Sequence, residues 1–163
     1  MNRSIKKKSN PYSKGLYTIT LAGLVAGILD SIAASLVFYL SLGFTPDQVL
    51  QYIASSLFGP SAFNGGILMV IIGSIMHFSI SIFVAAIYFY SYPKVKIINT
   101  RPVWSGLLYG AGIWIFLNLL ILPITKVQPV SFDVIDVAIA IFWHMILVGL
   151  PIALITKRHY YLK

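Results

Sequence analysis

Three ionisable side chains lie inside long apolar stretches of the sequence, namely Asp30, His77 and His144, and the amide Asn118 lies inside a fourth such stretch. A carboxylate can accept a hydrogen bond from a neutral imidazole or pair with an imidazolium, and either arrangement can pass a proton. An ionisable group at the centre of a membrane helix costs about 2.5–3.5 kcal/mol on insertion scales. These residues are therefore candidates for a functional site.

The spacing of these residues predicts that they share one depth in a membrane. If each stretch is a helix that rises about 1.5 Å per residue, Asp30 and His77 lie about 20 Å from one membrane edge and His144 about 18 Å. Asn118 falls at a similar or slightly more external depth. We therefore predict one polar cluster near the bilayer midplane, formed by Asp30, His77, Asn118 and His144.

The residue types in this cluster are compatible with more than one chemistry. Proton or cation relay is one reading, with Asp30 as the anionic partner and the histidines as titrating groups. A purely structural network between helices is another. Two histidines and one carboxylate also match a three-ligand metal site, with His77, His144 and Asp30 as candidates, and the two histidines could ligate haem b. No further spacing rule supports a cofactor, so the simplest expectation is that none is bound.

The composition defines the class of protein in which this cluster must work. Of the 163 residues, 58% are hydrophobic and 10% are charged, and the mean hydropathy is +0.87. Soluble domains carry about 25% charged residues. These values exclude a soluble enzyme, a nucleic-acid-binding domain and a disordered regulator, and they predict the lipid bilayer as the partner. Enzymatic motifs for nucleophilic, zinc or phosphate chemistry are absent, so we assign no catalytic residue.

Stretches without charge predict four transmembrane helices, because a helix needs about 20 apolar residues to cross the hydrocarbon core. Pro151 is expected to kink the fourth helix just beyond His144. We treat the chain as a single integral membrane domain, 1–163. The expected spans are about 17–41, 66–90, 104–123 and 135–156.

A short helix is predicted in the first outer loop, at about 46–58. Thr45, Pro46 and Gln48 form a helix start, and Gly59-Pro60 ends the helix. Its apolar residues recur at helical spacing, but it is too short to span the membrane. We expect it to lie along the membrane surface or partly re-enter, as a helix that covers the mouth of the bundle. A gating or substrate-binding role is the alternative.

The positive charges predict the orientation of the chain. Five cations precede the first span, three lie between the second and third spans, and three follow the fourth, whereas Lys126 alone lies in the other loops. Lys and Arg remain on the cytoplasmic side. The pattern therefore predicts four spans with both termini in the cytoplasm.

Small residues predict where the helices approach one another. Gly23, Gly27, Ser31 and Ser35 repeat every four residues, and Gly106 and Gly110 form a second such pair. Packing within the chain is the favoured use of these motifs, and a face for a homo-oligomer is the alternative. A structural or accessory subunit of a larger membrane complex is also compatible with the sequence.

The second half of the chain, about residues 76–158, contains a series of motifs that recur in one family. They are His77-x-x-x-Ser81 with Ala85 and Tyr88, Pro93-Lys94-Val95-Lys96, Gly106-Leu107-Leu108-Tyr109-Gly110-Ala111, Pro123, Pro129 and His144. Through these motifs the chain resembles the YagU-like family of small bacterial inner-membrane proteins. The resemblance implies a multi-spanning inner-membrane protein whose polar residues include the two histidines, and it implies no substrate. Asn118 stands where that family suggests a histidine. Asp30 is outside the match, and Gly23-x-x-x-Gly27 is the main similarity in the first half.

Taken together, the sequence predicts an all-α membrane protein. Its architecture is a four-transmembrane-helix bundle with both termini cytoplasmic and a short amphipathic helix in the first outer loop. The prediction is a small polytopic inner-membrane protein of unknown activity, in which the mid-membrane cluster is the candidate relay for protons or cations. An accessory subunit and a haem b or metal-binding protein remain the alternatives.

Overall fold

The computed structural model describes residues 11–128 and 133–161, and every regular element in these ranges is helical. Four helices are long and apolar enough to cross a membrane, which confirms the expected all-α class with four candidate spans. The expected topology signals at Arg3, Lys6, Lys7, Lys8 and Lys163, and the motif residue Pro129, lie outside the described residues. The candidate spans are Lys14–Leu42, Gly66–Ser91, Pro102–Ile124 and Val134–Tyr161.

Two spans are single helices and two are composite. The first span lies in α1 (Pro11–Leu42), and the second is α3 (Gly66–Ser91). The third span consists of α5 (Pro102–Ile115), the π-helical η2 (Phe116–Ile121) and the short 3-10 turn η3 (Leu122–Ile124). The fourth consists of α6 (Val134–Trp143), the π-helical η4 (His144–Gly149) and α7 (Leu150–Tyr161).

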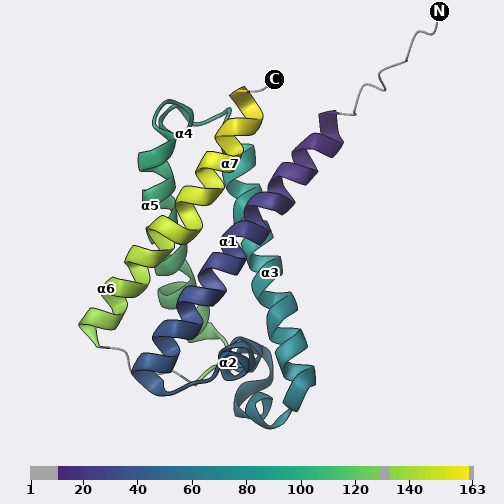
Figure 1. Cartoon of the computed structure of the whole chain (residues 1–163), viewed down its shortest axis with the longest axis vertical. Coiled ribbons are helices and arrows are strands. Elements are labelled where there is room, and N and C mark those ends of the chain that lie inside the picture. The colour runs from purple at the N-terminus through teal and green to yellow at the C-terminus, as the bar shows by residue number, and fades with distance from the viewer. Residues whose placement is uncertain (1–10, 129–132, 162–163) are drawn as a thin grey trace, which may run out of the picture.

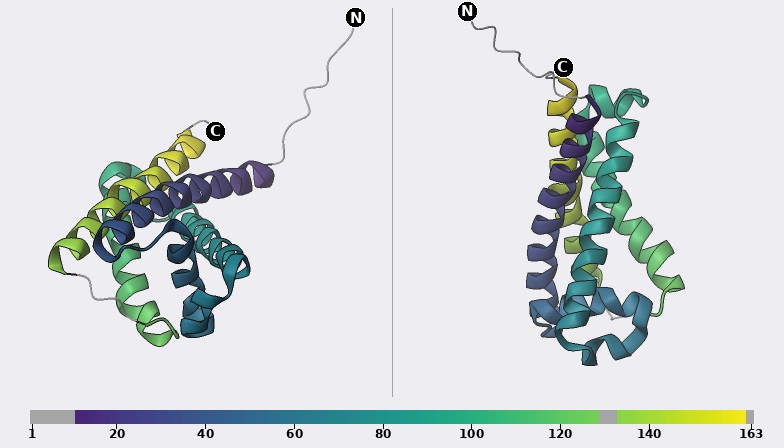
Figure 2. Two further views of the ribbon diagram at one scale, coloured as in Figure 1. Left: turned by 60° about the horizontal axis from the view of Figure 1, so that its bottom comes forward. Right: turned by 90° about the vertical axis from the view of Figure 1, so that its right-hand side faces the viewer.

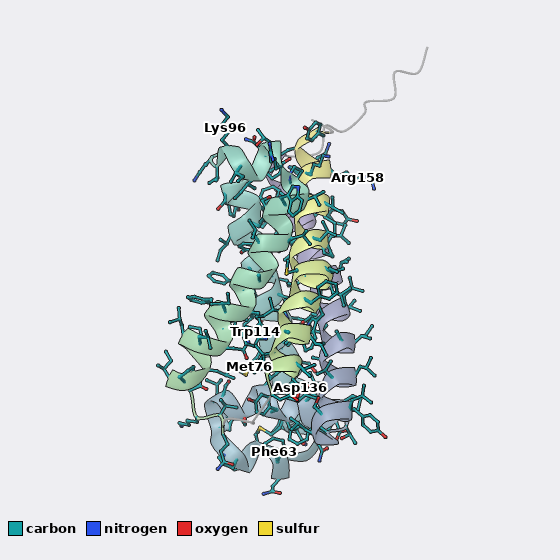
Figure 3. All side chains as sticks on the ribbon, turned by 90° about the vertical axis from the view of Figure 1, so that its left-hand side faces the viewer. Phe63, Met76, Lys96, Trp114, Asp136 and Arg158 are labelled. Atoms are coloured by element: carbon teal, nitrogen blue, oxygen red, sulfur yellow. The ribbon has the colours of Figure 1, made fainter. Side chains whose placement is uncertain are left out.

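The spans stand beside one another, and both ends of the chain lie at one end of the bundle, which we call the terminal end (Figure 1). The short helix α4 (Lys96–Thr100) lies there too, and Figure 3 shows Lys96 and Arg158 at this end. The opposite end, here the α2 end, carries α2 (Pro46–Phe58) and the 3-10 turn η1 (Gly59–Asn64). Figure 2 shows the third span diverging from the other spans as it approaches the α2 end.

The first and second spans approach closely because glycines remove the side chains between them. A Cβ atom added at Gly23 would lie 2.5 Å from the Cα atom of Ile82, and one added at Gly27 would lie 2.9 Å from the Phe78 ring. Lipid offers no hydrophobic drive for helix association, so such close packing must supply the attraction. This small-residue motif is therefore used inside the chain.

The third and fourth spans use glycine in the same way, at closer range. A Cβ atom added at Gly110 would lie 2.1 Å from the carbonyl oxygen of His144, and one added at Gly149 would lie 2.0 Å from that of Gly106. Here backbone meets backbone, so no side chain can move aside. These contacts fix the position of η4, the segment that begins with His144, against α5.

The buried core lies mainly toward the terminal end. It joins small residues of α1 to large side chains of α3 and to the start of α7. Tyr88 and Ile152 are among the largest side chains that are fully buried. Its members are Ala22, Ala26, Ala85, Tyr88, Tyr92, Ile113, Val148, Ile152 and Ala153.

Helix α2 has the expected bounds, and Gln48 accepts a hydrogen bond from the Thr45 backbone N–H at 2.9 Å. It packs against the bundle itself: a Cβ atom added at Gly73 of α3 would lie 1.9 Å from the carbonyl oxygen of Leu50. The Gln51 side chain is buried although it is polar, and it donates to the Gly66 carbonyl at 3.4 Å. The helix thus closes the α2 end of the bundle.

Candidate functional site

A cavity of about 240 Å³ lies in the half of the molecule nearer the α2 end. Side chains from all four candidate spans and from α2 line it, and Figure 3 shows three of them, Met76, Trp114 and Asp136, in that half. The structure places every residue of the predicted polar cluster in this wall: Asp30, His77, Asn118 and His144. The wall is otherwise mainly apolar.

The centre of the site is Asp30 on α1, which meets two consecutive residues of the fourth span. The indole Nε1–H of Trp143 donates a hydrogen bond to Asp30 Oδ1 at 2.8 Å. The Nε2 atom of His144 lies 3.5 Å from the same oxygen. The Asp30 and His144 side chains are 18% and 12% exposed, so both are largely shielded yet open to the cavity.

The second ring nitrogen of His144 determines where its hydrogen lies. Nδ1 is 2.8 Å from the carbonyl oxygen of Ala140, one turn back on the same helix. A carbonyl oxygen only accepts, so Nδ1 carries the hydrogen, and Nε2 of a neutral ring would be a bare acceptor. A bare acceptor that faces a carboxylate oxygen is repelled by it. The contact between His144 and Asp30 is therefore favourable when one proton is held between them.

His77 contacts the backbone of α1, whereas His144 contacts the Asp30 side chain. Its Nε2 atom lies 2.9 Å from the carbonyl oxygen of Gly27 on α1, so Nε2–H donates to the backbone of the neighbouring span. Gly27 lies three residues before Asp30, which puts the two contacts on adjacent turns of α1. His77 thus ties α3 to α1 next to the acid.

Asn118 lies on η2 and lines the cavity, but its hydrogen bond remains within its own span. Its side-chain N–H donates to the carbonyl of Trp114 at 3.0 Å. Within the described part of the chain no hydrogen bond joins either Asn118 or His77 to Asp30. The predicted cluster is therefore one cavity wall with one directly contacting pair, Asp30 and His144.

This geometry does not assemble the cofactor sites that the sequence left open. No three His, Asp, Glu or Cys side chains of the described residues come together as a metal site, so the candidate ligands His77, His144 and Asp30 are not gathered around one point. The Nε2 atom of His77 is engaged by Gly27, and that of His144 faces Asp30. Neither ring directs a free Nε2 atom toward a shared haem iron.

A second carboxylate lies at the outer part of the cavity wall. Asp136, in the first turn of α6, accepts a hydrogen bond from the Ser41 hydroxyl at 2.8 Å. An acid at this position is also stabilised by the N-terminal end of the helix dipole. The described residues that line the cavity include no Lys or Arg, so the wall is acidic apart from its two histidines.

Helix α2 contributes part of the cavity wall, through Val49, Tyr52, Ile53 and Ser56. The loop that follows the third span is fastened to it, because the backbone N–H of Lys126 donates to the Ser56 carbonyl at 3.0 Å. The short helix predicted in the outer loop therefore contributes directly to the candidate site.

Trp143 is the site residue that sequence reasoning missed. Its ring is 9% exposed and stacks on the His144 ring, with centroids 5.3 Å apart. A signal was present: membrane tryptophans gather at the interfaces, whereas Trp143 follows nine residues of the fourth span and directly precedes His144. A buried indole N–H needs an acceptor, and Asp30 is the acceptor that it finds.

Comparison of this chain with protein-family models, curated proteins and solved structures finds no match. The candidate function must therefore come from the chemistry of the cavity.

Proposed function

We propose that this chain is a small multi-pass membrane protein that relays protons or cations through the Asp30–His144 pair. The observation that carries the proposal is the 3.5 Å approach of His144 Nε2 to Asp30 Oδ1, with His144 Nδ1 already engaged by Ala140. Such a pair holds one proton and faces a cavity, so it can take up and release that proton.

The surrounding groups support a relay by holding the acid in place. Trp143 donates to Asp30 whether or not His144 is charged, so the carboxylate keeps its position while the proton comes and goes. His77 fixes the adjacent turn of α1 through Gly27. Pre-organised donors of this kind reduce the rearrangement needed in each transfer step.

The cellular setting is part of the same proposal. We place the chain in a bacterial inner (plasma) membrane, where the sorting of Lys and Arg favours an orientation with the terminal end in the cytoplasm and the α2 end outside. In that orientation the cavity lies in the outer half of the membrane. The resemblance to the YagU-like family is consistent with such a location and adds no substrate.

Proton flux into vesicles tests the relay. The purified chain is reconstituted with an internal pH-sensitive dye, and a potassium diffusion potential drives protons inward. We expect Asp30→Asn and His144→Gln each to lower the flux about tenfold or more, because each substitution removes one half of the proton-holding pair. Asn at position 30 keeps an acceptor for Trp143, so the fold is retained.

Two matched variants make the outcome decisive. Asp47→Asn makes the same change at an exposed acid of α2 that does not line the cavity, and we expect it to leave the flux unaltered. His77→Gln keeps an N–H donor for Gly27, so it should lower the flux less than His144→Gln. Flux equal to wild type in Asp30→Asn, together with lowered stability, would instead identify the pair as a structural link between helices.

A further inference from the structure

The cavity is larger than proton transfer requires. An engineered protein cavity of about 150 Å³ holds a benzene molecule, so about 240 Å³ holds a ring together with a short substituent. Aromatic side chains from α1, α2, α5 and α6 line this space: Phe38, Tyr52, Trp114 and Trp143. Mostly apolar walls with a few placed polar groups are typical of sites for small organic molecules.

The charges of the wall favour a cation as the occupant. Asp30 and Asp136 contribute carboxylates, no described lining residue is Lys or Arg, and the remaining titratable groups are His77, His144 and the Tyr52 phenol. Both carboxylates have partners, since Asp136 accepts from the Ser41 hydroxyl and Asp30 accepts from Trp143 and faces His144. Asp30 is the carboxylate that contacts an aromatic side chain, so we take it as the acid that an incoming positive charge would meet.

An organic cation fits this wall better than a metal ion. A metal ion needs several ligands around one point, and no three His, Cys, Asp or Glu side chains of the described residues come together in this way. An ammonium group on an apolar body needs one carboxylate and the faces of aromatic rings. The size, the aromatic lining and the carboxylate of Asp30 beside Trp143 agree on this class of ligand.

We propose that the cavity binds a small lipophilic ammonium ion, about the size of one aromatic ring with an ammonium substituent, and that binding displaces the proton shared by Asp30 and His144. This inference rests on the relay proposed above and names its substrate class. The imidazolium N–H bond at His144 Nε2 breaks, the proton leaves to water, and His144 becomes neutral. The ammonium ion then balances the Asp30 carboxylate, so the net charge of the site is the same before and after exchange.

A quaternary ammonium ion provides the sharpest probe, because it has no exchangeable proton of its own. Phenyltrimethylammonium is titrated into the full chain in weakly buffered detergent at neutral pH, and proton release is read with a pH indicator. Binding is followed by the fluorescence of Trp114 and Trp143 in a Trp104→Phe background, since Trp104 lies outside the cavity. We expect about one proton to be released per ion bound, and binding to weaken by up to about tenfold per unit fall in pH.

A neutral molecule of the same shape, tert-butylbenzene, separates charge recognition from simple filling of an apolar space. At equal free concentration it should bind at least about tenfold more weakly than the cation and release no proton. Equal binding of the two molecules, binding of the cation without proton release, or no binding of the cation would each overturn the inference. Both molecules are compared on the same protein, whose single substitution, Trp104→Phe, is at a side chain that is 64% exposed and outside the cavity.

Variants assign the roles within the pair and separate the two proposals. Asp30→Asn should weaken cation binding about tenfold or more, with Asp47→Asn unchanged, whereas His144→Gln should still bind the cation but release no proton. If the dye assay shows proton flux and the cation does not bind, the relay stands and the ligand class is wrong. If the cation binds with proton release and no flux occurs, the site is real and the relay is wrong.

Discussion

At the terminal end of the bundle, hydroxyl groups and rings fill the space between the helices, whereas toward the α2 end the helices enclose a cavity of about 240 Å³. Tyr88 of the terminal end is 1% exposed and shares a 2.7 Å hydrogen bond with the Ser105 hydroxyl. Tyr109 donates to the Val84 carbonyl at 2.7 Å. These two hydrogen bonds join the second span to the third.

Two residues mark the boundary between these regions. Ile113 and Val148 belong to the buried core and also line the cavity, so the core begins where the cavity ends.

At the terminal end, beyond the second span, burial raises the pKa of Tyr92, and the neighbouring phenols of Tyr161 and Tyr88 raise it further. Tyr92 therefore remains uncharged at neutral pH and stacks on Tyr160.

The comparison indicates that the two ends of the bundle have different roles: the terminal end stabilises the fold, and the α2 end holds the candidate site. One end uses close packing and hydroxyl links, which resist change because protein interiors tolerate neither voids nor added atoms. The other end leaves room around a single acid–histidine pair. Substitutions at the terminal end should therefore change stability, and those at the cavity should change exchange or binding.

The largest expected effect comes from the backbone contact that joins the two regions. In Gly110→Val, the new Cβ atom would lie 2.1 Å from the His144 carbonyl oxygen, so α5 and η4 must separate. We expect a loss of about 3 kcal/mol in the free energy of unfolding, at the upper end of the range for overpacking. Reversible unfolding in mixed micelles, followed by circular dichroism, measures this change.

Gly112 provides the matched control on the same helix, because a Cβ atom added there meets nothing within 4 Å. Gly112→Ala should be neutral or stabilising by up to about 1 kcal/mol, as expected for alanine in place of glycine inside a helix. A Gly110→Val protein as stable as wild type would show that the third and fourth spans do not depend on this contact.

A paired truncation tests the contrast between the two ends directly. Ile152 is fully buried in the core, whereas Ile53 of α2 faces the cavity and is partly exposed. Ile152→Ala should cost about 2–3 kcal/mol, because it leaves an unfilled space in a packed region. Ile53→Ala enlarges a space that already exists, so it should cost clearly less.

Unfolding curves of both variants in the same micelles decide the comparison. Equal losses would show that the α2 end is as tightly packed as the terminal end. The same Ile53→Ala protein is useful for the binding assay, since a larger cavity should still take up phenyltrimethylammonium while Asp30 is intact.

Much of this architecture could be predicted from sequence because lipid imposes simple rules. Charge-free stretches of sufficient length indicate the spans, and the start signal at Thr45-Pro46 gives the bounds of α2. The fourth span extends to Tyr161, five residues beyond the expected end, because Lys157 and Arg158 do not interrupt the helix. There, Tyr160 donates to the Phe89 carbonyl and so joins the end of α7 to α3.

The pairings inside the cavity could not be predicted, because helical depth places residues in a layer without giving their rotation. Asp30, His77 and His144 were expected as one cluster, yet His77 bonds to a backbone carbonyl, and an indole takes a place at the acid. A carbonyl acceptor is provided by every residue, so no sequence pattern marks Gly27 as the partner of His77.

The π-helical segments also escaped prediction. Both η2 and η4 end two residues before a proline, Pro123 and Pro151 respectively. A proline in a helix leaves a carbonyl without its usual donor, and a local π adjustment is one way in which membrane helices accommodate this. The sequence indicated a kink at Pro151, but a pattern of residue types does not say that the change in winding begins at His144.

The smallest expected effect tests whether a single hydroxyl at the terminal end carries measurable stability. Ser105 already donates toward the Pro102 carbonyl at 3.2 Å, so the Tyr88 hydroxyl is the donor in their shared bond. Tyr88→Phe removes that donor and leaves Ser105 with its other contact. Hydrogen bonds between membrane helices average about 0.6 kcal/mol, so we expect a loss of about 0.5–1.5 kcal/mol in unfolding free energy and no change in proton flux.

Tyr39→Phe, at a side chain that is 59% exposed, is the control and should alter neither the unfolding free energy nor the proton flux. A Tyr88→Phe protein with normal stability and reduced flux would reverse the assignment, because the terminal end would then take part in the relay that we place at the cavity.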